Sequence, residues 1–169
     1  MNAKKLQEVH LRLMTLDDLT QVEEIDAICF SSPWPADAFR YEIRQNANAI
    51  YWVAEVSQEK KAIIVASAVI WLILDEAHIG TLAVRPEYRG HGIGRRLLAR
   101  CLLESQQVGA KKAYLEVRRD NQQAQHLYCG FGFAVVGVRP CYYPDNHEDA
   151  LLMTLEVLDK AKLRSLSVA

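Results

Sequence analysis

A glycine-rich segment, Arg89-Gly90-His91-Gly92-Ile93-Gly94, has the composition of a loop that binds phosphate groups. Its three alternating glycines permit positive φ angles and a close approach of the backbone to a ligand. An apolar helical pattern follows, and the first turn of a helix has free N–H groups and a partial positive charge. With Arg89, Arg95 and Arg96 adding charge, such a loop can bind a pyrophosphate. It can equally be a flexible turn that only begins a helix, with its arginines in solvent.

The spacing of the glycines excludes two common nucleotide-binding loops. A Walker loop requires G-x-x-x-x-G-K, but the fifth residue after Gly90 is Arg95. A dinucleotide fingerprint requires G-x-G-x-x-G, and its last glycine would fall on Arg95 or on Leu97. What remains is a unit of strand, glycine loop and helix that matches neither pattern.

Further along the chain, Glu116 and Tyr128 have side chains that are suited to proton transfer. Glu116 lies in the alternating segment Lys112–Arg118, on the polar face that it shares with Tyr114 and Arg118. Taken alone, Glu116 is more simply a solvated strand carboxylate. Tyr128 lies on a short helical pattern, where a tyrosine is most often part of the core.

Metal binding and thiol chemistry are not predicted. His126 and Cys129 are three residues apart on one helical pattern, which could suit a metal pair or a thiolate–imidazole couple. No third ligand is near them in the sequence, and Cys141 is on a predicted loop. No C-x-x-C pair occurs, and a reducing compartment would keep the cysteines as thiols. Packing is predicted for all four, which are Cys29, Cys101, Cys129 and Cys141.

Length and composition indicate one globular domain. The chain has 169 residues, of which 50% are hydrophobic and 24% charged. A formal net charge of -1 argues against a nucleic-acid partner. The first 13 residues have no apolar run long enough for a signal peptide, and Ala62–Leu74 is too short to span a bilayer. We therefore expect a cytoplasmic protein that does not enter a membrane, with its domain over residues 1–158 and a tail of unpredicted structure over 159–169.

The first half of the chain alternates between strand and helix patterns. A helix begins near Thr15, which forms a capping-box pattern with Asp18, and the segment Phe30–Pro35 breaks it. Pro35 can be the first residue of a second helix that runs to about Gln45. Strands are predicted over Val9–Leu13, Ile50–Val56, Ala62–Leu74 and His78–Val84. A polar turn over Ser57–Lys61 and a second short turn make the last three antiparallel neighbours.

The second half requires some parallel pairing. Helices are predicted from about Gly92 to Val108 and from Asn121 to Cys129, where Gly130 and Gly132 end the second. Strands are predicted over Lys112–Arg118, Phe133–Arg139 and Ala150–Val157. The order β-α-β-α-β from residue 78 onward needs crossover helices. The predicted fold class is therefore α/β (α+β), with a mixed, mostly antiparallel sheet of about seven strands and helices on both faces.

Four motifs in this order resemble the GNAT acetyltransferase superfamily. The loop Arg89–Gly94 matches its signature Q/R-x-x-G-x-G/A. The other three are similar to motifs of the bacterial ribosomal-protein-alanine N-acetyltransferases (RimI type). These are FSSPWP (Phe30–Pro35), LEVRRDNQQAQHLYCGFGF (Leu115–Phe133) and RPCYYPDNHEDALLMTL (Arg139–Leu155). The resemblance covers nearly the whole chain and ends near Asp159.

The resemblance implies acetyl-CoA as the co-substrate, without a metal. The loop amides would bind its pyrophosphate, the preceding strand would pair with its pantetheine arm, and a splay of the central strands would leave the amide of Val84 free for the thioester carbonyl. The side chain of His91 is expected in solvent, and that of Asn121 either caps its helix or binds the pantetheine arm. The implied cofactor-binding residues are Leu82, Ala83, Val84, Arg89, Gly90, His91, Gly92, Ile93, Gly94, Arg95 and Asn121.

The resemblance also implies roles in proton transfer and substrate binding. Glu116 would be the general base, directly or through a water, and Tyr128 the general acid for the departing thiolate. An α-amine, with a pKa of about 7.7–8.0, asks less of a base than a lysine amine near 10.4. Five residues either line a groove for a peptide N-terminus or pack over a sheet edge, and they are Phe30, Pro33, Trp34, Tyr142 and Tyr143.

Three functions are consistent with these residues. The first is acetylation of the N-terminal α-amine of a protein or peptide, with a ribosomal protein as the natural target. The second is acetylation of a lysine or of a small-molecule amine on the same fold. The third is a non-catalytic acyl-CoA-binding regulator. The Y-Y-P and F-x-x-P-W motifs favour the first, and the presence of Glu116 and Tyr128 counts against the third.

Overall fold

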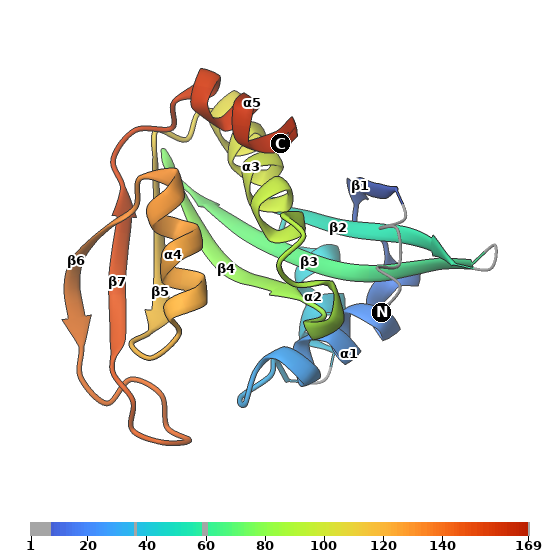
Figure 1. Ribbon diagram of the computed structural model, residues 1–169, viewed down its shortest axis with the longest axis horizontal. Coiled ribbons are helices and arrows are strands. Elements are labelled where there is room, and N and C mark those ends of the chain that lie inside the picture. Colours follow the sequence, from blue (N-terminus) through green and yellow to red (C-terminus); the bar gives the residue numbers. More distant parts are fainter. Residues whose placement is uncertain (1–7, 36, 59–60, 169) are drawn as a thin grey trace, which may run out of the picture.

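The computed structural model describes residues 8–35, 37–58 and 61–168, which form one mixed sheet with helices on both faces (Figure 1). The strands are β1 (Val9–Leu13), β2 (Ala49–Gln58), β3 (Lys61–Ile73), β4 (Glu76–Val84), β5 (Lys112–Arg118), β6 (Ala134–Arg139) and β7 (Ala150–Leu155). Their order across the sheet is β1-β2-β3-β4-β5-β7-β6. Neighbours are antiparallel except β4 and β5, which are parallel. The predicted fold class is confirmed.

Two hydrophobic cores attach the helices to the sheet. A smaller core lies under α1 (Leu19–Cys29) and α2 (Ala38–Gln45), against β2, β3 and β4. A larger core lies on the opposite face, under α3 (Ile93–Gln107), α4 (Gln122–Phe131) and α5 (Lys160–Val168). Two short 3-10 helices, η1 (Leu16–Asp18) and η2 (Pro86–Tyr88), precede α1 and α3. Because both faces are covered, the long strand β3 is apolar on both sides, as its sequence indicates.

Local sequence signals set several element ends. The Asp18 carboxylate accepts the backbone N–H of Thr15 at 2.8 Å, which is the reciprocal bond of the predicted capping box. Gly92 is the N-cap of α3, and Gly109, with a φ of 108°, follows its C-terminus. β5 has the predicted bounds, and its alternate residues Ala113, Leu115 and Val117 are buried.

Some predicted boundaries are wrong. α2 begins at Ala38 instead of Pro35, because the N-cap Asp37 has a left-handed backbone with a φ of 63°, which cannot be part of a right-handed helix. α4 runs through Gly130 and stops at Gly132, whose φ of 101° is left-handed. Residues 57, 58 and 61 of the predicted polar turn belong to β2 and β3, and 59–60 lie outside the described residues.

Residues 160–168, for which the sequence predicts no structure, form α5 and pack against α3. Leu163 of α5 is only 2% exposed and belongs to the larger core. Within the described residues, no helix is long and apolar enough to cross a membrane.

Candidate active site

The site is built around a gap between the two parallel strands. β4 and β5 pair over three residues only, from Glu76↔Lys112 to His78↔Tyr114, and then diverge (Figure 1). Arg85, directly after β4, donates its backbone N–H to Val65 of β3 at 2.9 Å. Because successive amides of a strand point to opposite sides, the N–H of Val84 points away from β3 and into the gap. The splay implied by the family resemblance is thus present in this chain.

A β-bulge at Gly80 accompanies the divergence. Thr81 is paired with Val69 but Ile79 with Ile70, so Gly80 is an extra residue in β4. A Cβ at Gly80 would lie 3.0–3.1 Å from the indole ring of Trp71. Only glycine therefore lets the strand bulge over that ring, and the bulge begins two residues after the last β4–β5 pair.

The glycine loop forms a cradle of backbone N–H groups. Gly90 and Gly92 have φ angles of 78° and 75°, and a Cβ at Gly90 would meet nothing within 4 Å. The first N–H with a partner inside α3 is that of Arg96, which donates to Gly92 at 3.0 Å. The N–H groups at the start of α3 are therefore available to an anion, with the positive end of the helix dipole behind them.

A cleft of about 280 Å³ joins the gap to the loop. Ten of the eleven residues predicted to bind the cofactor line it, all except His91. His91 is exposed, and its Nδ1 lies 3.3 Å from the Tyr88 carbonyl. A gap that opens the Val84 amide and leads to a glycine cradle fits a long chain that is joined to a pyrophosphate, as in acetyl-CoA.

The side chains of the three arginines near the loop point in different directions. Arg89 folds back onto the end of β4, where its Nε donates to the Val84 carbonyl at 3.0 Å. Arg95 lines the cleft. Arg96 reaches away from it and donates to the Val9 carbonyl at 3.3 Å, so the expectation that Arg96 adds charge to the loop is wrong. Successive residues of a helix are about 100° apart, which separates Arg95 from Arg96.

Tyr128 is a buried polar side chain in the cleft wall. Its side chain is 8% exposed, packs edge-on against Phe133 at 5.8 Å and contributes to the cleft lining. Burial raises its pKa, and the nearby Tyr143 raises it further. The phenol therefore stays protonated at neutral pH and can donate a hydrogen bond into the cleft.

Glu116 lies outside the cleft lining, on the opposite face of β5 from the buried residues. Its Oε1 is 2.6 Å from a guanidinium nitrogen of Arg139, and the carboxylate also accepts a hydrogen bond from the Tyr142 hydroxyl. This hydrogen bond is the largest cause of a raised pKa at Tyr142. A carboxylate has about four acceptor positions, so Glu116 can still take a proton from a further group.

The five predicted substrate residues lie in three different surroundings. Phe30 lines the cleft, and Pro33, three residues later in the same loop, is exposed. Tyr142 and Tyr143 stand edge to face at 5.1 Å near Glu116. Trp34 instead packs inward, between Phe39 at 4.6 Å and Trp71 at 5.8 Å. Of the two readings of Trp34, packing is therefore the one that the structure favours.

Two cysteines differ from their predicted packing, whereas Asn121 forms the helix cap that was one of its two predicted roles. Cys101 is buried, but Cys129 and Cys141 are exposed, so packing is the wrong prediction for these two. Cys29 is half-buried at the cleft, with its thiol 3.3 Å from the Val84 carbonyl. Asn121 caps α4, since its Oδ1 accepts the Ala124 N–H at 3.1 Å, and it also lines the cleft.

Sequence reasoning missed part of the cleft wall. Cys29, Tyr88, Gln123, Ala124 and Leu127 line it as well. The last three follow Asn121 on one helix face at i+2 to i+6, so the position of Tyr128 on α4 could have indicated them. Nothing in the local sequence indicates that Cys29, at the end of α1, lies against β4.

Comparisons with known proteins place this chain in a family. The model of the acetyltransferase (GNAT) family matches residues 19–133. The [ribosomal protein bS18]-alanine N-acetyltransferase of Escherichia coli K12 is 33% identical over 142 residues, which are 83% of this chain and 92% of its own. A Bacillus subtilis (strain 168) relative is 39% identical over 147 residues, 87% of this chain and 95% of its own.

Solved structures agree. The crystal structure of the E. coli ribosomal-protein-S18-alanine N-acetyltransferase matches with a TM-score of 0.77 and 30% identity, over 89% of this chain and 94% of that one. Arabidopsis thaliana NAA60 in complex with acetyl-CoA matches with a TM-score of 0.80 at 19% identity, over 88% and 98%, which shows a shared fold. The chain belongs to the GNAT acetyltransferase family, and the resemblance inferred from its four motifs is confirmed.

Proposed function

We propose that this protein transfers the acetyl group of acetyl-CoA to the N-terminal α-amine of a protein in the cytoplasm. A ribosomal protein that begins with alanine is the leading candidate, because the E. coli relative is named for that activity. The observation that carries the proposal is the β4–β5 gap, because it opens the amide of Val84 into a cleft that Tyr128 walls.

The residues of the cleft have distinct binding roles in this proposal. The N–H groups of the glycine loop and the first turn of α3 would hold the pyrophosphate, and Leu82–Val84 the pantetheine arm. Acetyl-CoA, when bound, supplies the acetyl group as a thioester. The N–H of Val84 would donate a hydrogen bond to the carbonyl oxygen, where negative charge develops.

Two side chains would handle protons. In the net reaction a C–N bond forms and a C–S bond breaks, and the amine must lose a proton while the sulfur gains one. Glu116 would receive the first, directly or through a water, since it is a carboxylate on the sheet face beside Tyr142. Tyr128 would give a proton or a hydrogen bond to the sulfur, because its burial keeps the phenol neutral.

An α-amine suits this site better than a lysine amine. The difference between a pKa near 8 and one near 10.4 costs lysine about 3.5 kcal/mol of deprotonation at neutral pH. Glu116 has an ion-pair partner in Arg139 and a hydrogen bond from Tyr142. Because these partners already occupy acceptor positions of the carboxylate, Glu116 suits an amine that is already partly deprotonated at neutral pH.

One experiment separates the candidate functions. The protein is incubated with acetyl-CoA and peptides whose N-termini are free or blocked, some containing lysine, together with polyamines, and acetylation is mapped by mass spectrometry. We expect acetylation of free N-termini, alanine foremost. Acetylation of blocked lysine peptides or of polyamines alone would refute the proposal. Tight acetyl-CoA binding without any turnover would instead indicate a regulator.

A further inference from the structure

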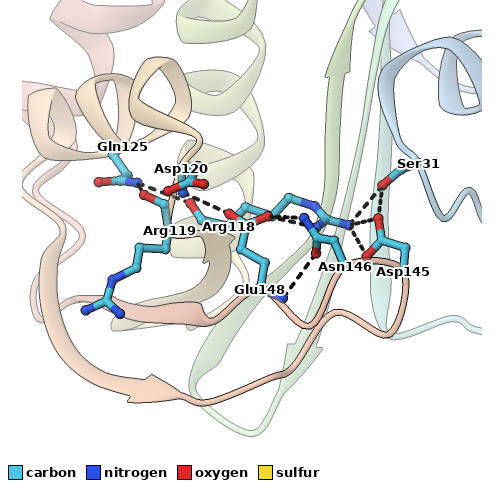
Figure 2. A network of polar contacts seen from close by, with 8 residues as sticks. All are labelled: Ser31, Arg118, Arg119, Asp120, Gln125, Asp145, Asn146 and Glu148. Atoms are coloured by element: carbon cyan, nitrogen blue, oxygen red, sulfur yellow. Dashed lines mark hydrogen bonds and ion pairs between the residues drawn. The ribbon is translucent and has the colours of Figure 1, made fainter.

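Arg118, the last residue of β5, stands at the centre of a polar network that is distinct from Glu116 and Tyr128 (Figure 2). One terminal nitrogen, Nη2, donates to both carboxylate oxygens of Asp145 at 2.9 and 3.0 Å and to Ser31 Oγ at 2.9 Å. The other, Nη1, donates to Glu148 at 2.9 Å and to Asn146 at 3.1 Å. One guanidinium thus has five acceptor contacts on four residues.

These contacts join two loops that are far apart in the chain. Ser31 belongs to the loop between α1 and α2, and Asp145 to the loop between β6 and β7. The Ser31 hydroxyl also donates to Asp145 at 2.5 Å. Ser31, Asp145 and Arg118 therefore form a three-residue contact between the two loops, which we call the joint. Both loops carry residues that are candidates for lining a groove for the peptide N-terminus, Phe30 on the first and Tyr143 on the second.

The network also reaches the helix of Tyr128. Glu148 uses its second oxygen to accept the Asp120 N–H at 2.8 Å, and Gln125 of α4 donates to the carbonyls of Arg118 and Arg119 at 3.1 and 2.7 Å (Figure 2). Asp120 and Gln125 flank the start of α4, three to eight residues before Tyr128. Arg118 is therefore connected to the α1–α2 loop, to the β6–β7 loop and to the start of α4.

Arg118 also contacts Tyr143, which lies near both proposed proton-transfer residues. The guanidinium carbon of Arg118 lies 3.8 Å from the centre of the Tyr143 ring. Tyr143 stands against Tyr142, which is bonded to Glu116, and it lies close enough to Tyr128 to raise the pKa of that residue. A shift of Tyr143 would thus disturb the surroundings of both proposed proton-transfer residues.

We propose that Arg118 is a positioning residue for the acceptor amine. It locks the α1–α2 loop to the β6–β7 loop through Ser31 and Asp145, and it holds Tyr143 at the wall of the acceptor site. The planar fork of an arginine suits this role, because a lysine ammonium cannot serve acceptors on two sides at fixed angles. This inference rests on the proposed function, since it assigns the acceptor to that side of the site.

The test compares R118Q and R118K with a matched control, R119Q. Arg119 is the next residue, and its 2.6 Å ion pair with Asp149 of the same β6–β7 loop lies outside the joint. Each variant is assayed for kcat and KM with a peptide that has a free N-terminal alanine, and for acetyl-CoA affinity by calorimetry. We expect R118Q and R118K to raise the peptide KM at least about tenfold, with acetyl-CoA affinity within about twofold and R119Q unchanged.

A milder variant tests the same contact with less risk that the protein misfolds. S31A removes one hydroxyl from an exposed loop and should raise the peptide KM in the same direction, by a smaller factor. Combined with R118Q it should add little, because both changes open one joint. A peptide KM that is unchanged in R118Q, or acetyl-CoA affinity that falls equally, would overturn the inference, as would full recovery in R118K.

Hydrogen exchange tests the joint without any substrate. The amides of Tyr143 and His147 are bonded inside the β6–β7 loop, at 3.1 and 2.8 Å. In R118Q both should exchange at least about tenfold faster than in the wild type and R119Q, since the loop loses its anchor. Unchanged exchange would overturn the inference even if the wild type acetylates no peptide, whereas that lack of turnover by itself would count against the proposed function only.

Discussion

At the scale of single residues, environment separates the two proposed proton-transfer groups. Tyr128 is enclosed by apolar neighbours, and burial keeps its phenol protonated. Glu116 is exposed on the other face of β5 and has a cationic partner in Arg139. A protonated donor on the cleft side and a carboxylate on the acceptor side are the two states that amine acetylation requires. Each can be tested by removing one functional group.

For Tyr128, we expect Y128F to lower kcat by about 100-fold and to leave acetyl-CoA affinity within about twofold. The protonated phenol is the active form, and its raised pKa means that this form persists through neutral and moderately alkaline pH. Wild-type kcat, measured from pH 7 to about 9.5, should therefore show no decline caused by Tyr128. A decline in that range that disappears in Y128F would contradict the assignment.

For Glu116, we expect E116Q to lower kcat/KM by about 100-fold at pH 6.5. The deficit should shrink at pH 9, because above its pKa of about 7.7–8.0 the α-amine arrives without its extra proton. E156Q is the matched control, since Glu156 pairs with Lys112 at the other end of β5 and should behave like the wild type. A deficit of equal size at both pH values would refute the role of base.

At the scale of elements, the shape of β4 makes the cleft. Three residue pairs hold it beside β5, and the bulge at Gly80 lies just beyond them. Trp71 sits against the bulge, bonded through its Nε1 to Glu42 at 3.2 Å and stacked on Trp34. The F-x-x-P-W motif thus supports the strand that frames the cleft, through its tryptophan.

Replacing Gly80 with alanine should disturb this arrangement. The new Cβ would lie about 3 Å from a ring that cannot easily move, so we expect a loss of about 1–3 kcal/mol of stability and weaker acetyl-CoA binding. The control is G130A in α4, where a Cβ meets nothing within 4 Å and alanine favours the helix. Thermal unfolding and calorimetry measure both. Unaltered acetyl-CoA affinity in G80A would show that the bulge does not shape the cleft.

At the scale of the whole molecule, the site and the C-terminal helix lie at opposite ends of α3. The glycine loop leads into the N-terminus of α3, and α5 packs beside its other half (Figure 1). α5 closes the larger core with Leu163, so it contributes to stability from a distance. Stability and cofactor binding should therefore be separable in this protein.

We expect L163A to destabilise the protein by about 2–4 kcal/mol, because it removes a buried leucine and leaves a cavity. Its melting temperature should fall by several degrees, while acetyl-CoA affinity below that temperature stays near the wild-type value. V168A, on the same helix but 84% exposed, should change stability by less than about 0.5 kcal/mol. Equal effects of the two substitutions would mean that α5 does not pack as described.

Most elements were predictable because their signals are local. The alternation in Lys112–Arg118 and the glycines at both ends of α3 mark those elements within a few residues. Where prediction failed, the sequence has no such local signal. α2 starts only after Asp37, whose left-handed backbone no local pattern indicates. α5 has Leu163 and Leu166 as its apolar stripe, which is too weak a pattern to predict a helix without α3 beside it.

By itself, the sequence determined the fold class, the family and the position of the glycine loop. The loop can be found locally, because a loop followed by a helix N-terminus is formed by the backbone of adjacent residues. Tertiary structure alone decided that Arg95 faces the cleft and Arg96 does not, that Trp34 packs inward, and that Cys29 lies at β4. It alone brought Ser31 to Asp145, across 114 residues, with Arg118 between them. Side-chain contacts of that range depend on how whole elements pack, which no local pattern encodes.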